Sequence, residues 1–325
     1  MIDDTAWQHA TMRRLRDLTP SVREFELVPA RGVRPWSPGS HLAVRVPVDG
    51  RQTLRHYSLI GGAAEAAARG AYRIAIKRMD PGRGGSRALW SLAEGATLEI
   101  GEPANHFEVA LQAPHHLLVA GGIGVTPLVG IAQALAARGG ALRMCYAARS
   151  DDELAYRDEL AAALGERLCT YVGARIDLEA EIAALPRDAQ MVVCGPLVLL
   201  DAARDAWARS GRPAAGLRFE TFGNTGRHAA QPFRVELVDR GLQFDVPADR
   251  SLLDLLDEAG IAALSDCRRG ECGLCAMRIV RCDGPVDHRD VFLSARQKAA
   301  DETFCACVSR AAGGTLVLDS AYRPD

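Results

Sequence analysis

Apolar and polar side chains alternate along much of the N-terminal third of the chain. In the stretches 24–27, 41–46 and 72–77 every second residue is apolar, as with Leu42 and Val44. A period of two is that of a half-buried β-strand, and Pro- and Gly-containing turns separate the stretches. Residues 8–108 are therefore predicted to form short antiparallel strands, closed into a small β-barrel or packed as a sandwich.

From residue 115 onward, short apolar runs alternate with segments of helical periodicity. Strands are predicted at 117–120, 142–147, 168–173 and 191–194. Helices are predicted at 152–164, 178–184 and 197–209, after a first one in which Leu128, Ile131 and Leu135 recur at helical spacing. Such alternation is typical of an α/β domain with a doubly wound parallel sheet.

A polar stretch without periodicity, residues 223–231, comes before the last segment, and we interpret 225–231 as a linker. Beyond it, two apolar stretches flank Asp239-Arg240-Gly241, which predicts a hairpin. The stretch 252–259 is amphipathic and precedes Gly260, which predicts a helix with a glycine after its end. The predicted domains are 1–109, 110–224 and 232–325.

The composition is that of a globular protein, with 48% hydrophobic and 25% charged residues among 325. A net charge of −2 argues against a nucleic-acid binder, and the short basic run Arg268-Arg269 is interpreted as part of a solvated face. No apolar run reaches the roughly 18 residues that span a bilayer, and Met1–Asp4 is acidic, unlike a signal peptide. We therefore expect a cytoplasmic protein without membrane or nucleic-acid partners, in which disulfides are rare.

Six of the nine cysteines gather in one C-terminal stretch, as in a metal site rather than a disulfide scaffold. Cys267, Cys272 and Cys275 have the C-x4-C-x2-C spacing of a plant-type [2Fe–2S] loop, which a distant fourth cysteine completes. Gly270 and Gly273 would let backbone N–H groups approach the sulfur atoms. A zinc site or buried free cysteines are the alternatives, although zinc sites usually pair two short Cys-x2–4-Cys knuckles.

The fourth cysteine has two candidates. Cys305 leaves 29 residues after Cys275, the spacing common in plant-type ferredoxins, whereas Cys307 leaves 31. Spacing alone therefore selects Cys305. Two other cysteines, Cys145 and Cys169, lie in predicted strands and are expected to be inert core residues.

A Gly-rich segment, Val119–Pro127, runs from a predicted strand into a predicted helix and contains Gly121, Gly122 and Gly124. Glycines there let the backbone approach a pyrophosphate, and the helix N-terminus offers free N–H groups; Pro127 suits the first helical turn. Cys194-Gly195-Pro196 ends another strand, at the carboxyl edge where such sheets bind ligands, although an ordinary turn would also explain it.

Arg149 and Ser150 follow the predicted strand 142–147 and precede three acidic residues, 151–153. The carboxylates would repel the 2′-phosphate of NADPH and accept from ribose hydroxyls, which predicts a preference for NADH. Arg149 opposes this prediction because it could pair with that phosphate. The acids would also favour the start of the next helix without any nucleotide.

Two polar motifs in the first segment suit a flavin. In Arg55-His56-Tyr57-Ser58, Arg can bind a phosphate, Tyr can pack on a ring and Ser can donate to a ring edge. Gly82–Ser86 supplies a Gly-rich turn that would bind an anion. Each motif alone is compatible with a surface hairpin. A flavin is nevertheless required, because nicotinamide gives two electrons as hydride and the cluster accepts one.

In their order and combination, these motifs resemble the phthalate dioxygenase reductases and vanillate demethylase reductases along essentially the whole chain. Further matching pieces are Ile74–Lys77, Glu220-Thr221-Phe222, Asp287-His288-Arg289-Asp290, Cys307-Val308-Ser309-Arg310 and Leu316–Asp319. The resemblance implies an FMN barrel, an NAD domain and a C-terminal plant-type ferredoxin of β-grasp fold. It also implies an NADH-dependent reductase whose electron acceptor is a Rieske-type oxygenase that acts on an aromatic or related substrate.

The motifs and the resemblance together give the candidate site residues. Those for FMN are Arg55, His56, Tyr57, Ser58, Ala75, Ile76, Lys77, Gly84, Gly85, Ser86 and Phe222. Those for the nucleotide are Gly121, Gly122, Gly124, Thr126, Pro127, Arg149, Ser150, Gly195 and Pro196, with Thr126, Cys194 and Glu220 aligning the nicotinamide. Trp90 keeps FAD as an alternative flavin, because an aromatic side chain after the Gly-rich turn could hold an adenine.

For the cluster, the resemblance selects Cys307 as the fourth ligand, because the family's ligand is the cysteine before the Ser309-Arg310 pair. The extra residues would lie near Arg281-Cys282, in a hairpin turn that tolerates insertion. The implied ligand set is Cys267, Cys272, Cys275 and Cys307.

Two other functions stay open beside the Rieske-linked reductase. Similar fused modules also feed haem monooxygenases, and no residue separates the two. The chain could also be a ferredoxin-like carrier that a separate enzyme reduces, but its nucleotide and flavin motifs argue against this.

Overall fold

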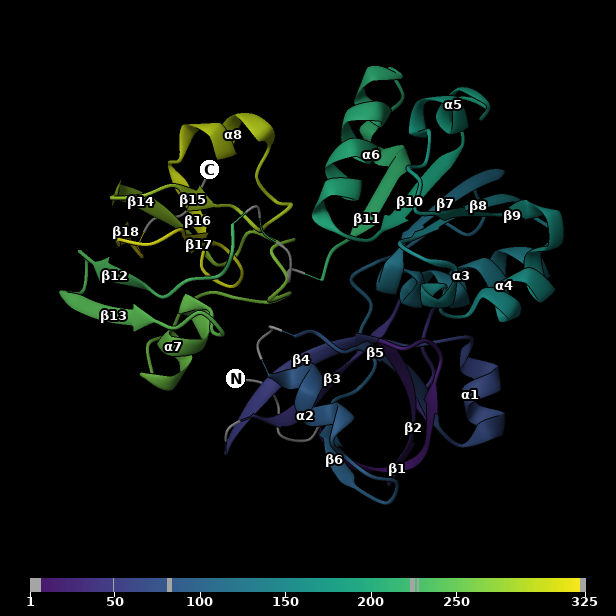
Figure 1. The fold of residues 1–325 in the computed structure, drawn as a ribbon, viewed down its shortest axis with the longest axis horizontal. Helices are drawn as coiled ribbons and strands as arrows, with labels where there is room; N and C mark the ends of the chain where they lie inside the picture. The colour runs from purple at the N-terminus through teal and green to yellow at the C-terminus, as the bar shows by residue number, and fades with distance from the viewer. Residues whose placement is uncertain (1–6, 49, 81–83, 223–225, 227, 322–325) are drawn as a thin grey trace. The chain divides into compact units, whose positions relative to one another are not determined.

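The computed structural model describes residues 7–48, 50–80, 84–222, 226 and 228–321. The acidic start Met1–Asp4, Gly82 and Arg83 of the predicted turn, and residues 225 and 227 of the predicted linker lie outside the described residues. The chain divides after Glu220 into two compact units, 1–220 and 221–325 (Figure 1).

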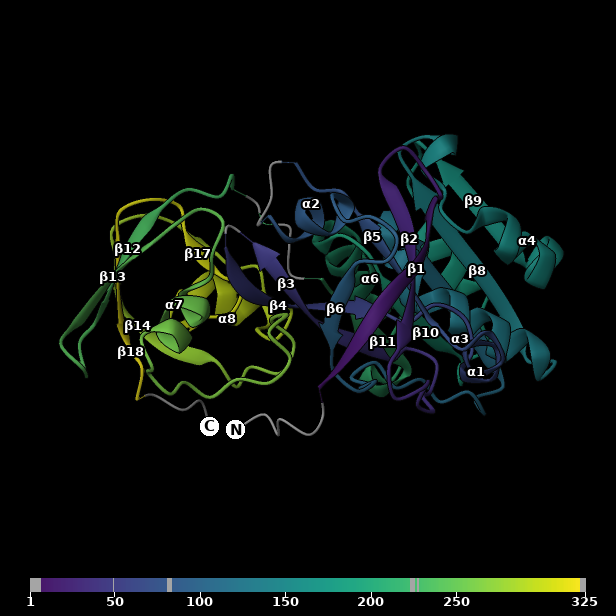
Figure 2. The ribbon, with the colours of Figure 1, turned by 90° about the horizontal axis from the view of Figure 1, so that it is seen from below.

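An antiparallel sheet of six strands curls into a barrel in the first unit (Figures 1 and 2). Its strands are β1 (Gln8–Asp17), β2 (Val22–Pro29), β3 (His41–Val48), β4 (Arg51–Ser58), β5 (Tyr72–Lys77) and β6 (Thr97–Ile100), with helices α1 (Ala63–Arg69) and α2 (Gly85–Trp90) between them. The order is β4-β3-β6-β1-β2-β5, and a bridge between Leu59 and Ile74 joins the two ends. The alternating residues Phe25, Leu27 and Leu42 are fully buried inside, which confirms the predicted barrel.

The second part of this unit is a parallel sheet with helices on both faces. Its strands are β7 (His115–Gly121), β8 (Ala141–Ala148), β9 (Leu168–Val172), β10 (Gln190–Cys194) and β11 (Leu217–Glu220), in the order β11-β10-β7-β8-β9. Its helices are α3 (Val125–Ala137), α4 (Arg157–Leu164), α5 (Leu178–Ala183) and α6 (Leu197–Arg209), with single turns at Gly122–Gly124, Asp151–Glu153, Gly165–Arg167 and Ala214–Gly216. Helices α3 and α4 cover one face and α5 and α6 the other (Figure 1), as predicted for a doubly wound fold.

The helix predicted at 152–164 is interrupted in the structure. One helical turn spans Asp151–Glu153, and α4 begins only at Arg157. Tyr156 between them has a φ of +61°, a left-handed conformation that is uncommon for a residue with a side chain. Its hydroxyl donates to the Glu24 carboxylate of β2 at 2.8 Å. The barrel thus fixes where α4 begins, which the pattern within this segment could not show.

The second unit is built on a mixed sheet of five strands. They are β12 (Phe233–Leu237), β13 (Leu242–Val246), β14 (Ala276–Cys282), β16 (Thr303–Cys305) and β18 (Thr315–Asp319), in the order β13-β12-β18-β14-β16. Strands β12 and β18 are parallel, and helix α7 (Leu252–Glu258) packs its leucines on the sheet, which gives the predicted β-grasp fold. Outside the sheet lie β15 (Val286–Asp287), β17 (Arg310–Ala311) and α8 (Ala295–Ala300).

Two local predictions in this unit are confirmed. The hairpin between β12 and β13 turns at Gly241, whose φ is +63°. Helix α7 begins after Ser251, whose hydroxyl accepts from the Asp254 N–H at 3.2 Å, and the cysteine loop follows between α7 and β14. In the described part of the chain, no helix is long and apolar enough to cross a membrane.

Candidate flavin, nucleotide and cluster sites

The candidate phosphate site for the flavin forms where β4 meets the start of α2. A Cβ on Gly85 would lie 2.9 Å from the Arg55 Nε, so the guanidinium packs directly against the glycine turn. The Ser86 hydroxyl accepts from the Met79 N–H at 3.1 Å and ties this turn to the end of β5. A guanidinium beside backbone N–H groups at a turn suits a terminal phosphate.

The four residues that end β4 lie on two faces of the strand. Arg55 and Tyr57 are opposite Val44 and Leu42 of β3, and Tyr57 packs against the barrel core. His56 alternates to the other face, where its ring meets that of His41 edge-on at 5.1 Å. The predicted flavin set is therefore brought together only in part, because Arg55 and Tyr57 share a face from which His56 points away.

The predicted flavin edge of β5, Ala75–Lys77, is engaged at two points. The Ile76 carbonyl accepts from the Trp90 indole N–H at 3.0 Å, and the Lys77 ammonium lies 3.2 Å from the Glu153 carboxylate. The guanidinium groups of Arg23 and Arg78 stack on the Trp90 ring at 4.5 and 5.0 Å. Trp90 therefore already has a hydrogen-bond partner and two stacking partners within the barrel. This weakens the reason for expecting its ring to hold the adenine of FAD.

The glycines of the nucleotide loop serve two different purposes. A Cβ on Gly124 would lie 2.2 Å from the Cys194 carbonyl oxygen, and one on Gly121 would lie 2.8 Å from Pro196. These glycines, with Gly195, let the ends of β7 and β10 pack against each other. Gly122 differs, because its φ is +53° and a Cβ there would meet nothing within 4 Å. It is the glycine at which a pyrophosphate has room to approach.

The candidate nicotinamide residues lie at the carboxyl ends of adjacent strands. Cys194 of β10 is paired in register with Ala120 of β7 on one side and with Glu220 of β11 on the other. Thr126, in the first turn of α3, is buried, and its hydroxyl donates to the Ile123 carbonyl at 2.9 Å. The parallel sheet therefore brings Cys194 and Glu220 to one edge, where such folds bind ligands. Phe222 is half-buried and belongs to the second unit.

The three acidic residues predicted to distinguish NADH from NADPH all have hydrogen-bond or ion-pair partners within the protein. Asp151 lies 2.7 Å from the Arg157 guanidinium, and the Ser150 hydroxyl donates to Asp152 at 2.5 Å. Glu153 accepts from the Ser21 hydroxyl of the barrel at 2.5 Å. Arg149 and Ser150 are exposed at the end of β8, so Asp152 is the acid held beside the predicted nucleotide contacts.

The cysteine loop directs backbone N–H groups at sulfur. The Cys267 Sγ accepts from the N–H groups of Arg269, Glu271 and Cys272 at 3.3–3.4 Å. A Cβ on Gly270 would lie 2.7 Å from Val308, so only glycine lets the loop pack on the tail that carries Cys307. N–H donors of this kind stabilise bound thiolates, and the loop fits an iron–sulfur cluster.

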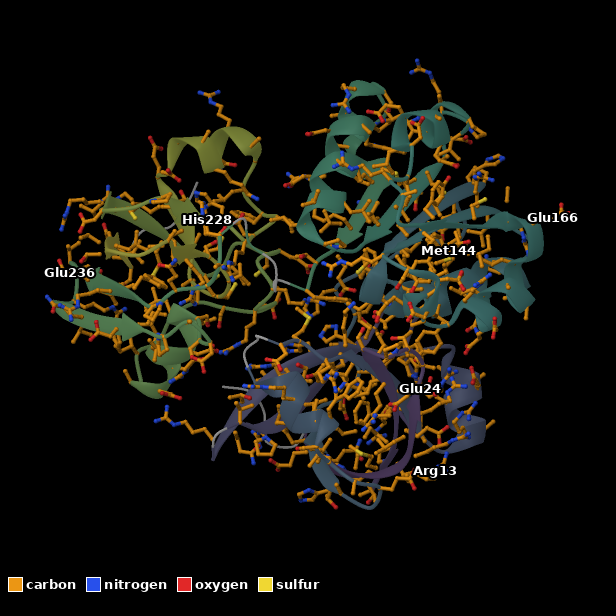
Figure 3. The ribbon with its side chains drawn as sticks, viewed as in Figure 1. Arg13, Glu24, Met144, Glu166, His228 and Glu236 are labelled. Carbon is orange, nitrogen blue, oxygen red and sulfur yellow. The ribbon has the colours of Figure 1, made fainter. Side chains whose placement is uncertain are left out.

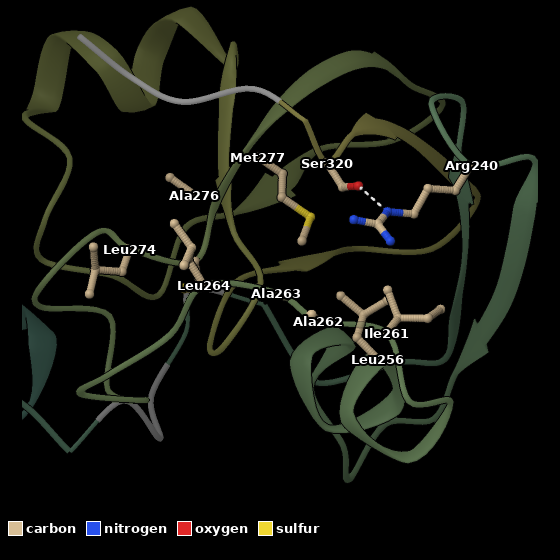
Figure 4. A pocket seen from close by; sticks show the side chains of 11 residues that line it. Arg240, Leu256, Ile261, Ala262, Ala263, Leu264, Leu274, Ala276, Met277 and Ser320 are labelled. Atoms are coloured by element: carbon tan, nitrogen blue, oxygen red, sulfur yellow. Dashed lines mark hydrogen bonds between the residues drawn. The ribbon is translucent and has the colours of Figure 1, made fainter. Parts of the chain in front are cut away.

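The thiols form one pair and one group of three. Cys267 contacts Cys272, while Cys275 contacts Cys307 and also Cys305. Two irons that each take two thiolates would use the pair and two members of the group of three. In the described ranges, no group of three His, Cys, Asp or Glu side chains is arranged to hold a single metal ion. Behind Cys275, a cavity of about 10 Å³ is too small for a substrate (Figure 4).

Two observations favour Cys307 over Cys305 as the fourth ligand. The N–H of Gly270, inside the cysteine loop, is directed at the Cys307 sulfur, and Cys307 is near enough to Cys267 for their charges to interact. Strand β14 also contains a register shift between Ile279 and Arg281, which is the mark of an extra residue. That bulge lies next to the place where the resemblance puts the added length. The assignment of Cys307 stays a prediction.

The interpretation of Arg268-Arg269 as a solvated face is wrong for Arg269. Only 6% of its surface is exposed, and its guanidinium lies 3.2 Å from the Glu271 carboxylate within the loop. Burial raises the pKa of Glu271 to about 7, and its carboxylate accepts from the Thr221 N–H at 2.7 Å. A charge run looks solvated in sequence because the partner that allows its burial is unknown.

The Asp287–Asp290 motif fastens the tail of the chain to the cysteine loop. The buried Asp290 carboxylate accepts from the Ser309 hydroxyl at 3.2 Å and from the Leu293 N–H at 2.9 Å. The N–H groups of Val291 and Phe292 donate to the Gly270 carbonyl at 2.9 and 3.1 Å. These bonds hold Ser309, two residues after Cys307, against the loop, which gives the motif a structural role.

Comparison with known proteins agrees with this division into parts. Residues 16–109 match the oxidoreductase FAD-binding domain family, and residues 118–205 match the oxidoreductase NAD-binding domain family. Residues 235–312 match the 2Fe–2S iron–sulfur cluster binding domain family. The predicted classes of cofactor, namely a flavin, a nicotinamide nucleotide and a [2Fe–2S] cluster, are confirmed. The predicted domain boundaries and the individual ligands stay predictions.

Similar proteins span the whole chain. The heme-dependent oxidative N-demethylase beta subunit of Ectopseudomonas mendocina is 38% identical over 310 residues, 94% of this chain and 96% of the relative. A solved structure of phthalate dioxygenase reductase, described as modular for electron transfer from pyridine nucleotides to [2Fe–2S], has a TM-score of 0.78 and 32% identity, covering 97% of this chain and 98% of that one. An intact type IV self-sufficient cytochrome P450 monooxygenase has a TM-score of 0.67 and 34% identity over 96% of this chain, which spans 41% of that longer chain. The chain therefore belongs to the phthalate dioxygenase reductase family of NAD-dependent flavin and iron–sulfur oxidoreductases.

Proposed function

We propose that this protein is the NADH-dependent reductase component of an oxygenase system. Hydride passes from NADH to FMN, and single electrons leave through the [2Fe–2S] cluster to a Rieske-type terminal oxygenase acting on an aromatic or related substrate. The observation that carries the proposal is the presence, in one chain, of a cysteine loop whose thiols gather with a cysteine of the tail, together with the flavin and nucleotide loops.

In this proposal, the protein speeds hydride transfer by aligning the nicotinamide with the flavin. A bound flavin takes the two electrons of a hydride and gives them up singly. The side chains of Thr126, Cys194 and Glu220 would hold the nicotinamide at the carboxyl edge of the parallel sheet. Because the nicotinamide and the flavin carry the chemistry, no general acid or base of this chain is expected to be essential.

The acceptor is tested by anaerobic titration with NADH followed by mixing with purified oxygenases. The visible bands of the flavin and the cluster should bleach with NADH alone, and a Rieske oxygenase should then reoxidise them faster than a haem oxygenase does. The haem alternative has its own support in the N-demethylase relative and the P450 neighbour. Faster reoxidation by a haem oxygenase would therefore replace the Rieske assignment, whereas a neighbouring gene that carries the Rieske C-x-H and C-x2-H pair would support it.

FMN is proposed as the flavin because Arg55 and the Gly85 turn would hold a terminal phosphate, while Trp90 is used within the barrel. Acid release and chromatography should recover FMN, and recovered FAD would refute the proposal. Arg55→Ala should lose most of the bound flavin, since charge-assisted contacts to phosphate are strong. Arg87→Ala, on an exposed side of α2, is the matched control and should retain it.

NADH is proposed as the preferred nucleotide. Asp152, held beside Ser150 at the end of β8, would repel a 2′-phosphate placed there. The kcat/KM for NADH should exceed that for NADPH, and equal values would rule the preference out. Asp152→Asn should reduce the difference in kcat/KM between NADH and NADPH, whereas Asp158→Asn on the exposed face of α4 should leave it unchanged.

Phe222 is proposed to cover the flavin face until nicotinamide displaces it. This role rests on the match of Glu220-Thr221-Phe222 to the family and on the position of Glu220 at the sheet edge. Phe222→Ala should perturb both the flavin spectrum and the rate of flavin reduction by NADH. An unchanged spectrum together with an unchanged rate would count against this role.

A further inference from the structure

A network of charged and polar side chains, buried at its centre, joins the flavin barrel to the α/β domain within the first unit. Its centre is Arg73 of β5, whose side chain is 7% exposed and whose guanidinium lies 2.8 Å from Glu24 of β2 and 2.9 Å from Glu159 of α4. A guanidinium is always charged, so burying it requires such partners. Glu65 of α1 also lies 3.2 Å from this guanidinium, so the barrel supplies the cation and two carboxylates, and the α/β domain supplies the third, Glu159.

Two neutral side chains complete this network. The Tyr156 hydroxyl donates to Glu24 at 2.8 Å, and the Arg73 guanidinium lies 5.6 Å from the centre of the Tyr156 ring. The Gln133 amide of α3 donates to Glu159 at 2.9 Å. We call Glu24, Arg73, Gln133, Tyr156 and Glu159 the junction network. It links β2 and β5 of the barrel to α3 and α4, and Figure 3 marks Glu24 on the barrel.

The junction network is close along the chain to both candidate cofactor sites. Arg73 is two residues before Ala75–Lys77, the predicted flavin edge, and Tyr156 is six residues after Ser150 at the predicted nucleotide site. A second link joins the same segments, because Glu153 accepts from Ser21 at 2.5 Å and lies 3.2 Å from Lys77. Displacing this segment from the barrel would therefore move the nucleotide loop relative to the flavin edge.

The protonation states of the side chains in the junction network favour a single pattern of hydrogen bonds. Burial raises the pKa of Tyr156, so its hydroxyl remains a donor. Although burial acts to raise the pKa of Glu159, hydrogen bonds from Arg73 and Gln133 hold it below its usual value, so the carboxylate remains an acceptor. The strained φ of +61° at Tyr156 is tolerated only while these contacts over-determine its position. Apolar packing could also join the two domains, but it would lack directional bonds.

We propose that the junction network sets the position of the nicotinamide against the flavin, and that Arg73, Tyr156 and Glu159 are positioning residues for hydride transfer. The proposal rests on hydride transfer between these two groups in the first unit, and it is independent of the identity of the electron acceptor. Small misplacement of reacting groups is costly, since a shift of about 1 Å can slow a reaction on the order of 100-fold.

The test uses two isosteric variants of the full-length protein loaded with flavin and cluster. In Tyr156→Phe and Glu159→Gln, stopped-flow measurement without any acceptor should show flavin reduction by NADH slowed about tenfold. The flavin–nicotinamide charge-transfer absorbance should weaken, and the isotope effect with deuterated NADH should rise. Flavin content and the EPR signal of the reduced cluster should stay as in the wild type.

The chain offers matched controls inside the α/β domain. The Tyr171 hydroxyl donates to Glu181 at 3.0 Å, and Arg143 binds the same carboxylate at 2.5 and 2.8 Å, with no partner from the barrel among these bonds. Tyr171→Phe and Glu181→Gln should lower the melting temperature and leave flavin reduction at the wild-type rate. If the junction variants lose only stability, or if the controls slow hydride transfer equally, the network has no positioning role. Failure of every oxygenase to accept electrons would leave these readouts unaffected.

Discussion

Single sulfur atoms decide whether the second unit holds its cluster. Cys305 and Cys307 both contact Cys275, but the Gly270 N–H of the cysteine loop points at Cys307. Cys307→Ser should abolish or grossly alter the visible and EPR spectra of the cluster, because four thiolates are needed. Cys305→Ser, two residues away, should leave both spectra nearly intact. The reverse result would show that chain spacing is the better guide and that the family match slips by two residues at this end.

Reactivity of a second cysteine tests the expectation of inert core thiols. Cys145 is fully buried in β8, and burial raises the pKa of its thiol to about 12. Only the thiolate reacts with alkylating reagents, so Cys145 should resist iodoacetamide at pH 8 in the native protein and react after unfolding. Mass spectrometry of peptides from native and unfolded samples measures both states. Equal labelling of Cys145 in the two samples would contradict this prediction.

Elements with a strong internal pattern were predictable from sequence. The period of two placed Leu42 and Val44 inside the barrel, and helical periodicity over 197–209 located α6. The interruption before α4 was not predictable, because it depends on the hydrogen bond between Tyr156 and Glu24, which are 132 residues apart. Local pattern reports which face of an element is buried but not the distant partner of a buried polar group.

The candidate sites also contain residues that were predictable from sequence and residues that were not. Clustered cysteines and glycine turns are recognisable because few residue types provide thiolates or accept positive φ. Charged residues carry no such signal, so the buried pair of Arg269 and Glu271 and the pairing of Arg73 with Glu159 were missed. Their residue types are common on surfaces, and only the fold reveals that they are buried.

One contact between elements tests how closely α3 must approach the barrel. A Cβ on Gly130 of α3 would lie 2.2 Å from the backbone oxygen of Gly61. Gly130→Ala should therefore destabilise the protein by about 1–3 kcal/mol through overpacking and slow hydride transfer by separating the domains. Gly62→Ala is the control, since a Cβ there would meet nothing within 4 Å and the φ is −117°. Thermal unfolding and stopped-flow flavin reduction measure the two effects, and equal behaviour of both variants would contradict the prediction.

For the molecule as a whole, the two units divide the predicted chemistry between them. The proposed flavin and nucleotide residues lie in 1–220, apart from Phe222, and the four predicted cluster ligands lie in 221–325. A variant without the cluster, Cys272→Ser, should still reduce its flavin with NADH at close to the wild-type rate. It should also reduce ferricyanide while losing electron delivery to an oxygenase or to cytochrome c.

Anaerobic spectra and steady-state assays with both acceptors measure this separation. His9→Ala, on an exposed position of β1, serves as a control that should keep both activities. Loss of flavin reduction in Cys272→Ser, with the flavin still bound, would show that the cluster unit is required for the hydride step itself.

The mutual packing of Gly121, Gly124 and Gly195 constrains how such chains can diverge. At these glycines the space that a Cβ would need is occupied by Leu199, Pro196 or the Cys194 backbone, whether or not a nucleotide is bound. A descendant that lost its coenzyme would therefore still be under selection to keep them. Gly122 faces open space and would be released from that selection, apart from its φ of +53°. Substitution of Gly122 would therefore indicate that a lineage no longer uses NAD. Retention of the other three glycines would not show that NAD is still used.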